Sequence, residues 1–302
     1  MALAVLASGC IHTGGGDRQE SAKAITINSF SVVPQEIREG TSARVSLDLE
    51  NTGQLPAEIR LGNKGQRVLK DYCPDIFSVS QEDFSVTTSG TKEAGSVTLQ
   101  PGDRLNLMWQ LRQQGDVPLI GYTCDVEVQL PFNYTVQTYR QVQIKKKREV
   151  QGSPELSWES SSGPMLFAIE TVGSTVGKAS TFIATEPGES RQLQVLLQLR
   201  NQRREDYNKG VVDVNEQSLH VSATSPLQLD ESFGNMEKCD LQSSEDIRMF
   251  EGQSRVISCN LDLPQRSELD APSQISRISA EVEYTYLQSV GSRTVRVKPR
   301  AN

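Results

Sequence analysis

Apolar and polar residues alternate along several stretches of the chain, first within residues 25–59. Pro34 and Gly40 mark two turns there, and the stretch after them has an apolar side chain at every second position. Such a period, bounded by Pro and Gly, is typical of a half-buried strand in a two-sheet sandwich. The apolar side of this strand carries Ala43, Val45, Leu47 and Leu49. The pattern therefore predicts an all-β chain.

The same alternation continues further along the chain. It recurs in residues 105–111, 122–130, 193–199 and 278–284. Trp109 is in phase with apolar neighbours, so we expect it to anchor a core rather than to present a surface for a ligand. The Pro101-Gly102 pair predicts a tight turn before its strand.

The plan of the first half reappears after residue 164. The turn at residues 186–189 repeats the one at 100–103, and Asn201 ends a strand as Asn51 does. Residues 148–163 lose the alternation and are rich in Ser, Gly and Pro, as in a linker. We therefore expect two tandem immunoglobulin-like β-sandwich domains, each of about seven strands. The expected bounds are 1–23 for a signal and tether, 24–147 for the first domain, 148–163 for the linker and 164–302 for the second domain.

Composition narrows the class of protein further. Of the 302 residues, 36% are hydrophobic and 23% are charged, and no apolar run reaches the roughly 18 residues of a membrane-spanning helix. The net charge is −7 and basic residues are scattered, so we expect no nucleic-acid partner. A basic cluster at residues 145–148 is interpreted as a solvated strand end, with a phosphate-binding patch as the alternative.

The N-terminal residues resemble the end of a lipoprotein signal peptide. An apolar run and the small residues 7–9 lead directly to Cys10, and a polar, glycine-rich stretch follows. The resemblance implies cleavage before Cys10, lipidation of its sulfur and a position on the extracellular face of the cytoplasmic membrane. Stable anchoring would need two acyl chains, because one gives only marginal retention. The alternative is a first strand with Cys10 as a spare thiol.

The other four cysteines divide evenly between the halves of the chain. We expect disulfides between Cys73 and Cys124 and between Cys239 and Cys259, since Cys124 and Cys259 are in phase with core positions. Loops of about 50 and about 20 residues would then give roughly 4 and 3 kcal/mol in the chain-entropy model. Pairing across the domains and five reduced cysteines are the alternatives.

The chain has few residues suited to catalysis or to metal binding. Its two histidines, His12 and His220, are too few for a histidine zinc site, and His12 falls in the expected tether. Asp213 belongs to a fragment that lacks the glycine and the final carboxylate of a calcium loop. We therefore expect no catalytic residues, no metal and no cofactor. Asn133 begins the one Asn-x-Ser/Thr sequon, in a predicted turn at residues 131–133, and is a candidate for glycosylation.

Strand ends such as Asn51-Thr52-Gly53, the Pro-Gly turns and the two-copy layout resemble CARDB-like and other immunoglobulin-like modules of archaeal and bacterial surface proteins. The resemblance implies a non-enzymatic surface protein that acts in binding, adhesion or spacing, with a protein or glycan partner. A second hypothesis is a subunit of an extracellular assembly that adds a strand at a free sheet edge. A solute-binding or hydrolytic surface protein is the third.

Overall fold

A computed structural model describes most of the chain after residue 23. The described residues are 24–118, 120–147, 156–161, 163–172, 181–201, 210–214, 219–227, 229–232, 238–240, 247–250 and 252–299. Cys10 and His12, and with them the expected signal and tether, lie outside this part of the chain. Among the described residues, no helix is long and apolar enough to cross a membrane.

The described chain is built almost entirely of strands. In the first half these are β1 (Ile25–Val33), β2 (Glu36–Arg38), β3 (Ser42–Asn51), β4 (Ala57–Arg60), β5 (Leu69–Asp71), β6 (Phe77–Ser78), β7 (Phe84–Thr88), β8 (Thr91–Glu93), β9 (Ser96–Leu99), β10 (Arg104–Gln113) and β11 (Tyr122–Lys145). They are followed by β12 (Trp158–Ser160), β13 (Met165–Val172), β14 (Thr181–Ile183), β15 (Gln192–Asn201), β16 (Gly210–Val214), β17 (Leu219–Ala223), β18 (Leu229–Ser232), β19 (Ile247–Met249), β20 (Ser254–Asp262) and β21 (Ser273–Lys298). Two short 3-10 helices span Asn63–Gly65 and Arg266–Glu268.

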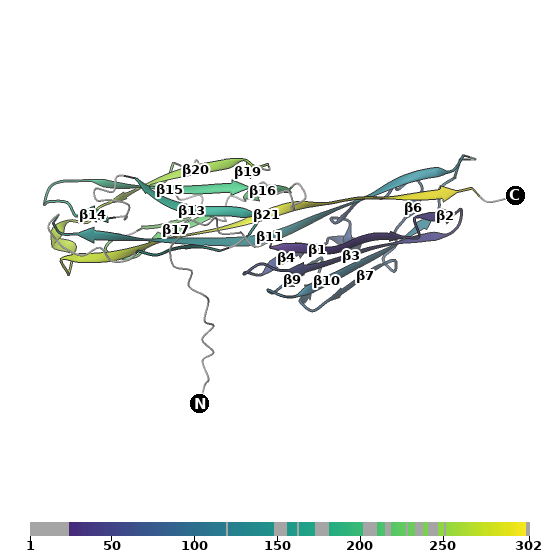
Figure 1. The fold of residues 1–302 in the computed structure, drawn as a ribbon, viewed down its shortest axis with the longest axis horizontal. Helices are drawn as coiled ribbons and strands as arrows, with labels where there is room; N and C mark the ends of the chain where they lie inside the picture. The colour runs from purple at the N-terminus through teal and green to yellow at the C-terminus, as the bar shows by residue number, and fades with distance from the viewer. Residues whose placement is uncertain are drawn as a thin grey trace, which may run out of the picture.

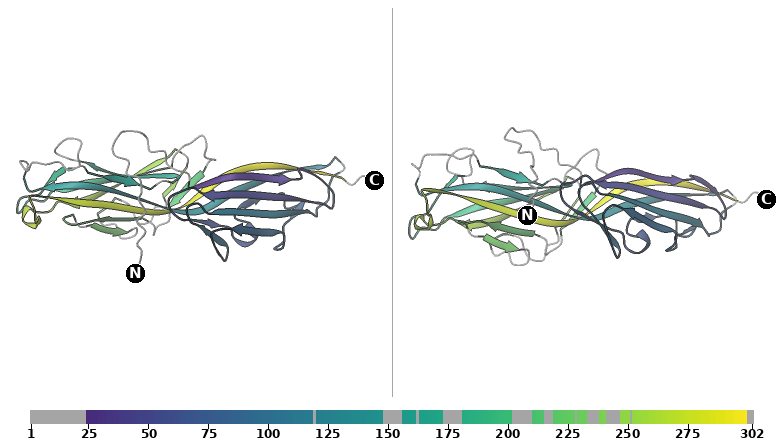
Figure 2. Two further views of the ribbon diagram at one scale, coloured as in Figure 1. Left: turned by 60° about the horizontal axis from the view of Figure 1, so that its bottom comes forward. Right: turned by 90° about the horizontal axis from the view of Figure 1, so that it is seen from below.

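Two long antiparallel strands, β11 and β21, run through both halves of an elongated molecule (Figure 1). Every residue of the 24-residue β11 has a partner in β21. This two-stranded ribbon is the centre of one long sheet. Two smaller sheets pack against the long sheet, one in each half of the molecule. The sheet containing β1, β3 and β10 packs on the ribbon in the first half, and that of β13, β15 and β20 in the second half; Figure 2 gives two further views.

Alternation along the strands places one face of each in a core. In the first half the buried face of β10 carries Leu105, Leu107, Trp109 and Leu111. Trp109 is fully buried, as predicted, and its indole Nε1–H donates to the Lys64 carbonyl at 3.0 Å. In the second half, β15 buries Leu193, Val195, Leu197 and Leu199. The predicted all-β class with two sandwiches is confirmed.

Aromatic side chains lie where the ribbon passes from one half to the other. Tyr134 lies directly opposite Tyr284, with ring centroids 6.2 Å apart, and Phe132 is opposite Tyr286 at 5.5 Å. All four are buried, so the core continues across the junction. Because a two-stranded ribbon twists along its length, one face of β11 turns from the first small sheet toward the second.

A β-bulge beside the junction keeps the two long strands in phase. The partners of Gln129 and Val128 are Ser289 and Gly291, so β21 has one extra residue at this step. Gly291 has a φ of 108°, in the region that glycine tolerates best. The inward side of β21 thereby changes from even-numbered to odd-numbered residues, and both strands keep their apolar sides in the core.

Some local predictions were wrong. The turn predicted at residues 131–133 lies inside β11, and the alternating stretch at residues 278–284 is only part of the much longer strand β21. Pro131 lies between the segments of β11 that pair with β5 and with β4, where the missing N–H costs the ladder little. The division at residues 148–163 stays a prediction, but Trp158–Ser160 pairs with β11, and β2 pairs with residues 296–298 of β21.

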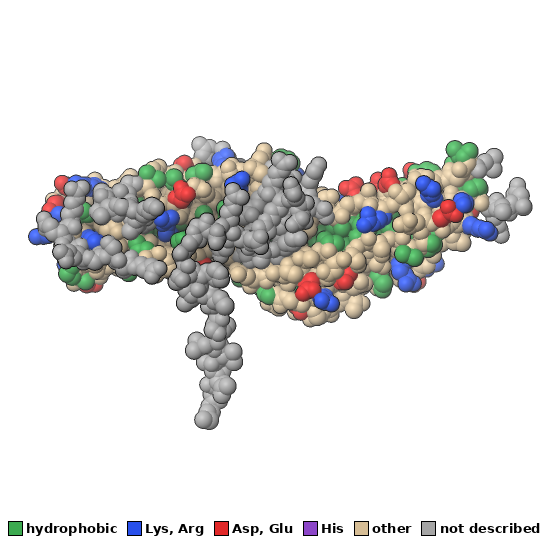
Figure 3. Space-filling model, viewed as in Figure 1, with side chains coloured by type: hydrophobic (Ala, Val, Ile, Leu, Met, Phe, Trp, Pro, Cys, Tyr) green, Lys and Arg blue, Asp and Glu red, His purple; other side chains and the backbone are tan. Residues whose placement is uncertain are grey.

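Charges of both signs are interspersed on the surface. Figure 3 shows basic and acidic side chains next to one another on the face that it draws, and apolar side chains gathered at the end of the first half near the C-terminus. Ile120 is almost completely exposed there. Four of the described ion pairs join side chains that are each about a third exposed or more, so they add little to stability.

Candidate functional site

A cleft of about 390 Å³ lies on the outer face of the long sheet in the second half, beside the junction. Four strands form its floor: β12, β11, β21 and β17. Gln54 and Leu55, from the loop between β3 and β4 of the first half, line it as well. The cleft is thus built from residues of both halves.

Strand register arranges the floor as two parallel rows of polar side chains. In one row Gln137 lies opposite Glu281, which lies opposite His220. The neighbouring row consists of Glu159, Tyr139, Ser279 and Ser222. These side chains face outward because their immediate neighbours in each strand fill the core. Two carboxylates, an imidazole, an amide, two hydroxyls and a phenol therefore share one surface.

Direct contacts position several of these groups. The Arg277 guanidinium carbon lies 3.9 Å from the centroid of the Tyr139 ring, a cation–π contact. The Gln137 amide nitrogen donates to the Glu281 carboxylate at 2.7 Å. The Tyr139 ring with Arg277 and the hydrogen-bonded pair of Gln137 and Glu281 thus lie side by side on the floor. Because these side chains are already held in place, a ligand would lose less free energy in ordering them on binding.

The residues from the first half are held by partly buried hydrogen bonds. The N–H of Leu55 donates to the Tyr134 hydroxyl at 3.3 Å, and its carbonyl accepts from the Asn51 amide at 3.0 Å. Burial raises the pKa of Tyr134, and hydrogen bonds from the Leu55 and Gln54 backbone offset part of that rise. The phenol therefore stays neutral at physiological pH and serves as an acceptor for the Leu55 N–H.

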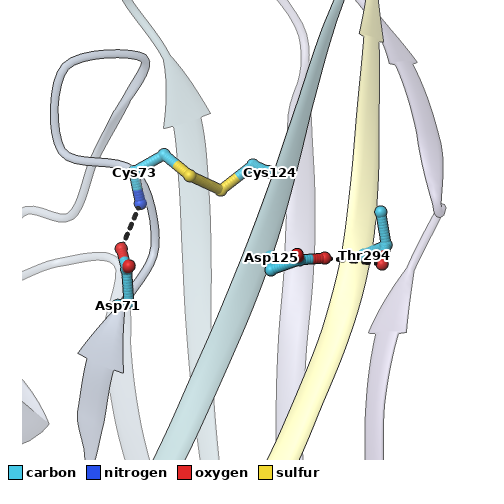
Figure 4. Close-up of a disulfide and its surroundings, with 5 residues drawn as sticks. All are labelled: Asp71, Cys73, Cys124, Asp125 and Thr294. Atoms are coloured by element: carbon cyan, nitrogen blue, oxygen red, sulfur yellow. Dashed lines mark hydrogen bonds between the residues drawn. A yellow bond between two sulfur atoms is a disulfide. The ribbon is translucent and has the colours of Figure 1, made fainter.

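The four cysteines other than Cys10 form two disulfides, each within one half of the chain. Cys73 is joined to Cys124, and the Cys73 N–H donates to the Asp71 carboxylate at 2.9 Å (Figure 4). Cys73 has a φ of 52°, which is rare for a residue with a side chain. The second disulfide joins Cys239 and Cys259 of β20, which lie opposite each other in an isolated antiparallel bridge.

The sequon asparagine lies in a less accessible place than predicted. Asn133 is buried within β11, where its amide nitrogen donates to Glu58 and its amide oxygen accepts from Thr285. A glycan on this nitrogen would break the contact with Glu58. Glycosylation of Asn133 stays a prediction, and this geometry disfavours it.

The other candidates take up different positions. His220 is an exposed residue of β17 and lines the cleft. Asp213 pairs with Arg248 in the strand ladder, while the rest of its acidic fragment lies outside the described residues. No group of three or more His, Cys, Asp or Glu among the described residues is arranged to hold a metal ion.

Sequence reasoning missed most of the cleft. Tyr139 and Arg277 are far apart in the chain, and only the pairing of β11 with β21 brings them together. The sequence signal that could have found the cleft is the type of residue at the outward-facing positions of each strand. Tyr139, for example, is an aromatic residue at a solvent-facing position. That signal identifies single residues and does not show which strands are neighbours.

Comparisons with known proteins give no family for the chain. No family model matches it, and no curated protein does. Solved structures that align with it include the Enterococcus faecalis MSCRAMM ACE, which binds its ligands by the collagen hug model, at 8% identity and a TM-score of 0.17, covering 90% of this chain and 95% of that one. The Staphylococcus aureus collagen adhesin CNA aligns at 6% identity and a TM-score of 0.16, covering 92% of each chain. The collagen-binding domain of the Erysipelothrix rhusiopathiae surface protein RspB aligns at 8% identity and a TM-score of 0.15, covering 93% of this chain and 98% of that one. TM-scores this low carry no argument about fold or function.

Proposed function

We propose that the protein is a non-enzymatic binding module of the cell surface, held to the membrane by a lipid on Cys10. The observation that carries the proposal is the cleft, in which polar side chains of four strands and a loop of the other half converge. Binding sites are usually concave, and a few fixed polar groups in them set the orientation of the ligand. The disulfides agree with an exported protein, since such bonds persist in oxidising compartments.

The chemistry of the cleft suits an extended polar ligand. Carboxylates of Glu159 and Glu281 accept hydrogen bonds, Arg277 donates them, and the serine hydroxyls do both. A polypeptide backbone or a glycan presents the complementary mixture of donors and acceptors. A protein or glycan partner at the cell surface is therefore the ligand class that we propose.

Binding assays with cleft variants test this role. Purified protein would be applied to immobilised glycans and surface polypeptides, and any ligand found would be titrated against Tyr139→Ala and Glu281→Gln. Loss of the ring or of the charge should weaken binding at least about tenfold, as for a central contact of an interface. The matched control is Gln194→Ala, an exposed residue of β15 on another face. Undiminished affinity in both cleft variants, with thermal stability retained, would remove the cleft from the proposal.

The anchor is tested separately. Cys10→Ser should move the protein from the membrane fraction to the medium, and intact-mass measurement of the wild type should show a lipidated N-terminal cysteine. Membrane association that is unchanged in the variant would reject the lipid.

Two of the described edge strands are protected against assembly by strand addition. The edge strand β1 carries a bulge between Ile27 and Ser29, and the edge strand β8 exposes Lys92 and Glu93. Bulges and charged side chains are devices that prevent edge-to-edge pairing. We therefore retain the binding module as the proposed function.

A further inference from the structure

The two halves repeat each other at a constant spacing. Asn201 and Gly252 lie 150 positions after Asn51 and Gly102, respectively, so the counterpart of the turn at residues 100–103 is the turn at Gly252 and not, as the sequence suggested, the one at residues 186–189. In both halves the asparagine carbonyl accepts from the glycine N–H, at 2.7 and 3.0 Å. The asparagine amide donates to the carbonyl of Leu99 in one half, and to the carbonyl of Met249, again 150 positions on, in the other. Equal contacts at equal spacing indicate two copies of one unit.

The same spacing relates positions whose side chains have diverged. Trp109 stacks on Phe84, its cross-strand neighbour, with ring centroids 5.4 Å apart. The counterpart of Trp109, 150 positions on, is Cys259. Cys259 lies opposite Cys239 in an isolated antiparallel bridge, and these two residues form a disulfide. At equivalent positions, the first copy thus has a stacked aromatic pair and the second copy has a disulfide.

The long strands carry the axis that relates the copies. Tyr134 and Tyr284 are counterparts at the same spacing, and they lie directly opposite each other in the β11–β21 ladder. When equivalent residues of two antiparallel strands are partners, a twofold rotation between them exchanges the strands. The pseudo-twofold axis therefore passes between these two tyrosines.

Across this axis each copy extends its last strand into the other half. In the first half, the C-terminal part of β21 lies between β11 and β2, and β2 runs parallel to it. In the second half, the C-terminal part of β11 lies between β21 and β14, and β14 runs parallel to it. The two arrangements are the same, with the roles of the copies exchanged.

The exchanged segments are part of the cores. Val295 and Val297 of β21 are buried in the first half, and Val142 and Ile144 of β11 are buried in the second. Without the strand from the other copy, each half would expose the core residues that pack against these side chains, and β2 or β14 would lose its ladder partner. Burial on that scale is what holds a small sandwich together.

We propose that each half is an incomplete sandwich, which the last strand of the other copy completes. The molecule is thus a single-chain form of a strand-exchanged dimer. Neither half is then a self-sufficient domain. A surface protein built in this way keeps both halves, and with them the cleft at their junction, even when the chain is cut between the copies.

Controlled cleavage of the full chain tests the proposal. A specific protease site would be inserted within residues 148–155, between β11 and β12, and the protein cut after folding. Both disulfides lie within single fragments, so no covalent bond would join the pieces. We expect the fragments to co-elute in size-exclusion chromatography at the volume of the uncut protein. A matched control carries the same site in the turn at Gly188, between β14 and β15, where cleavage cuts within the second copy and leaves β13 and β14 attached to the first.

Refolding of separated fragments distinguishes exchange from simple adhesion of two domains. The fragments would be separated in denaturant with their disulfides intact, and each returned to buffer alone and mixed. Exchange predicts that the mixture regains the native circular dichroism spectrum and elution volume, whereas each fragment alone stays unfolded or pairs with itself. Two fragments that each refold as monomers with native strand content would overturn the proposal.

Discussion

Replacing Asn51 by alanine tests the role of the buried asparagine that ends β3. The residue is fully buried, and its amide nitrogen donates to the carbonyls of Leu99 at 2.8 Å and Leu55 at 3.0 Å. Its amide oxygen accepts from the Gly53 N–H at 2.9 Å. Alanine removes all three bonds and leaves their partners near the junction without this side chain.

The expected loss follows from the number of buried partners. Each buried polar group left unsatisfied costs about 1–3 kcal/mol, and the bond to the Leu55 carbonyl counts for less because it is only partly buried. For the two buried partners, the Leu99 carbonyl and the Gly53 N–H, we expect a loss of about 3 kcal/mol in the free energy of unfolding. For a protein of this size that corresponds to a fall of roughly 6–12 °C in Tm. Because Leu55 lines the cleft, ligand binding should weaken as well.

Denaturant unfolding followed by circular dichroism would measure the change. Asn201→Ala, the counterpart in the second half, should lower the same single transition by about 1–3 kcal/mol, since its amide donates to the buried Met249 carbonyl. The control is Gln194→Ala, whose exposed hydrogen bond to Ser258 should contribute less than about 0.5 kcal/mol. A loss below about 1 kcal/mol for Asn51→Ala would refute the assignment of these bonds as buried and necessary.

Two further predictions concern the first half. Burial raises the pKa of Asp83, but hydrogen bonds from Ser80 and Arg112 outweigh it and hold the pKa below its usual value. The stabilisation is therefore present above about pH 4 and is lost as pH falls through the folded-state pKa, so the stability difference between wild type and Asp83→Asn should shrink in acid unfolding; a constant difference would contradict this. Replacing both Cys73 and Cys124 by serine should cost about 4 kcal/mol in denaturant unfolding, and an unchanged midpoint would show that the loop is held by other contacts.

Local pattern determined the elements and the cores. A period of two residues, with Pro and Gly at its ends, was enough to place the strands β3, β10 and β15 and to predict that Trp109 is buried. The physical reason is that a strand with one face in a core must alternate, whichever strand lies beside it. The inward phase of Cys124 and Cys259 likewise indicated which thiols could be bridged within each half.

Only the tertiary structure decided which distant strands are neighbours. Residues 131–133 have the composition of a turn, yet they lie inside β11, because pairing with β21 and β4 extends the strand through them. The cleft depends on the same pairing, since it sets Tyr139 beside Arg277 and brings the Leu55 loop to the floor. Alternation states which way a side chain faces and carries no information on the partner strand. Ladder hydrogen bonds and a shared core select that partner, and they exist only when both segments are folded together.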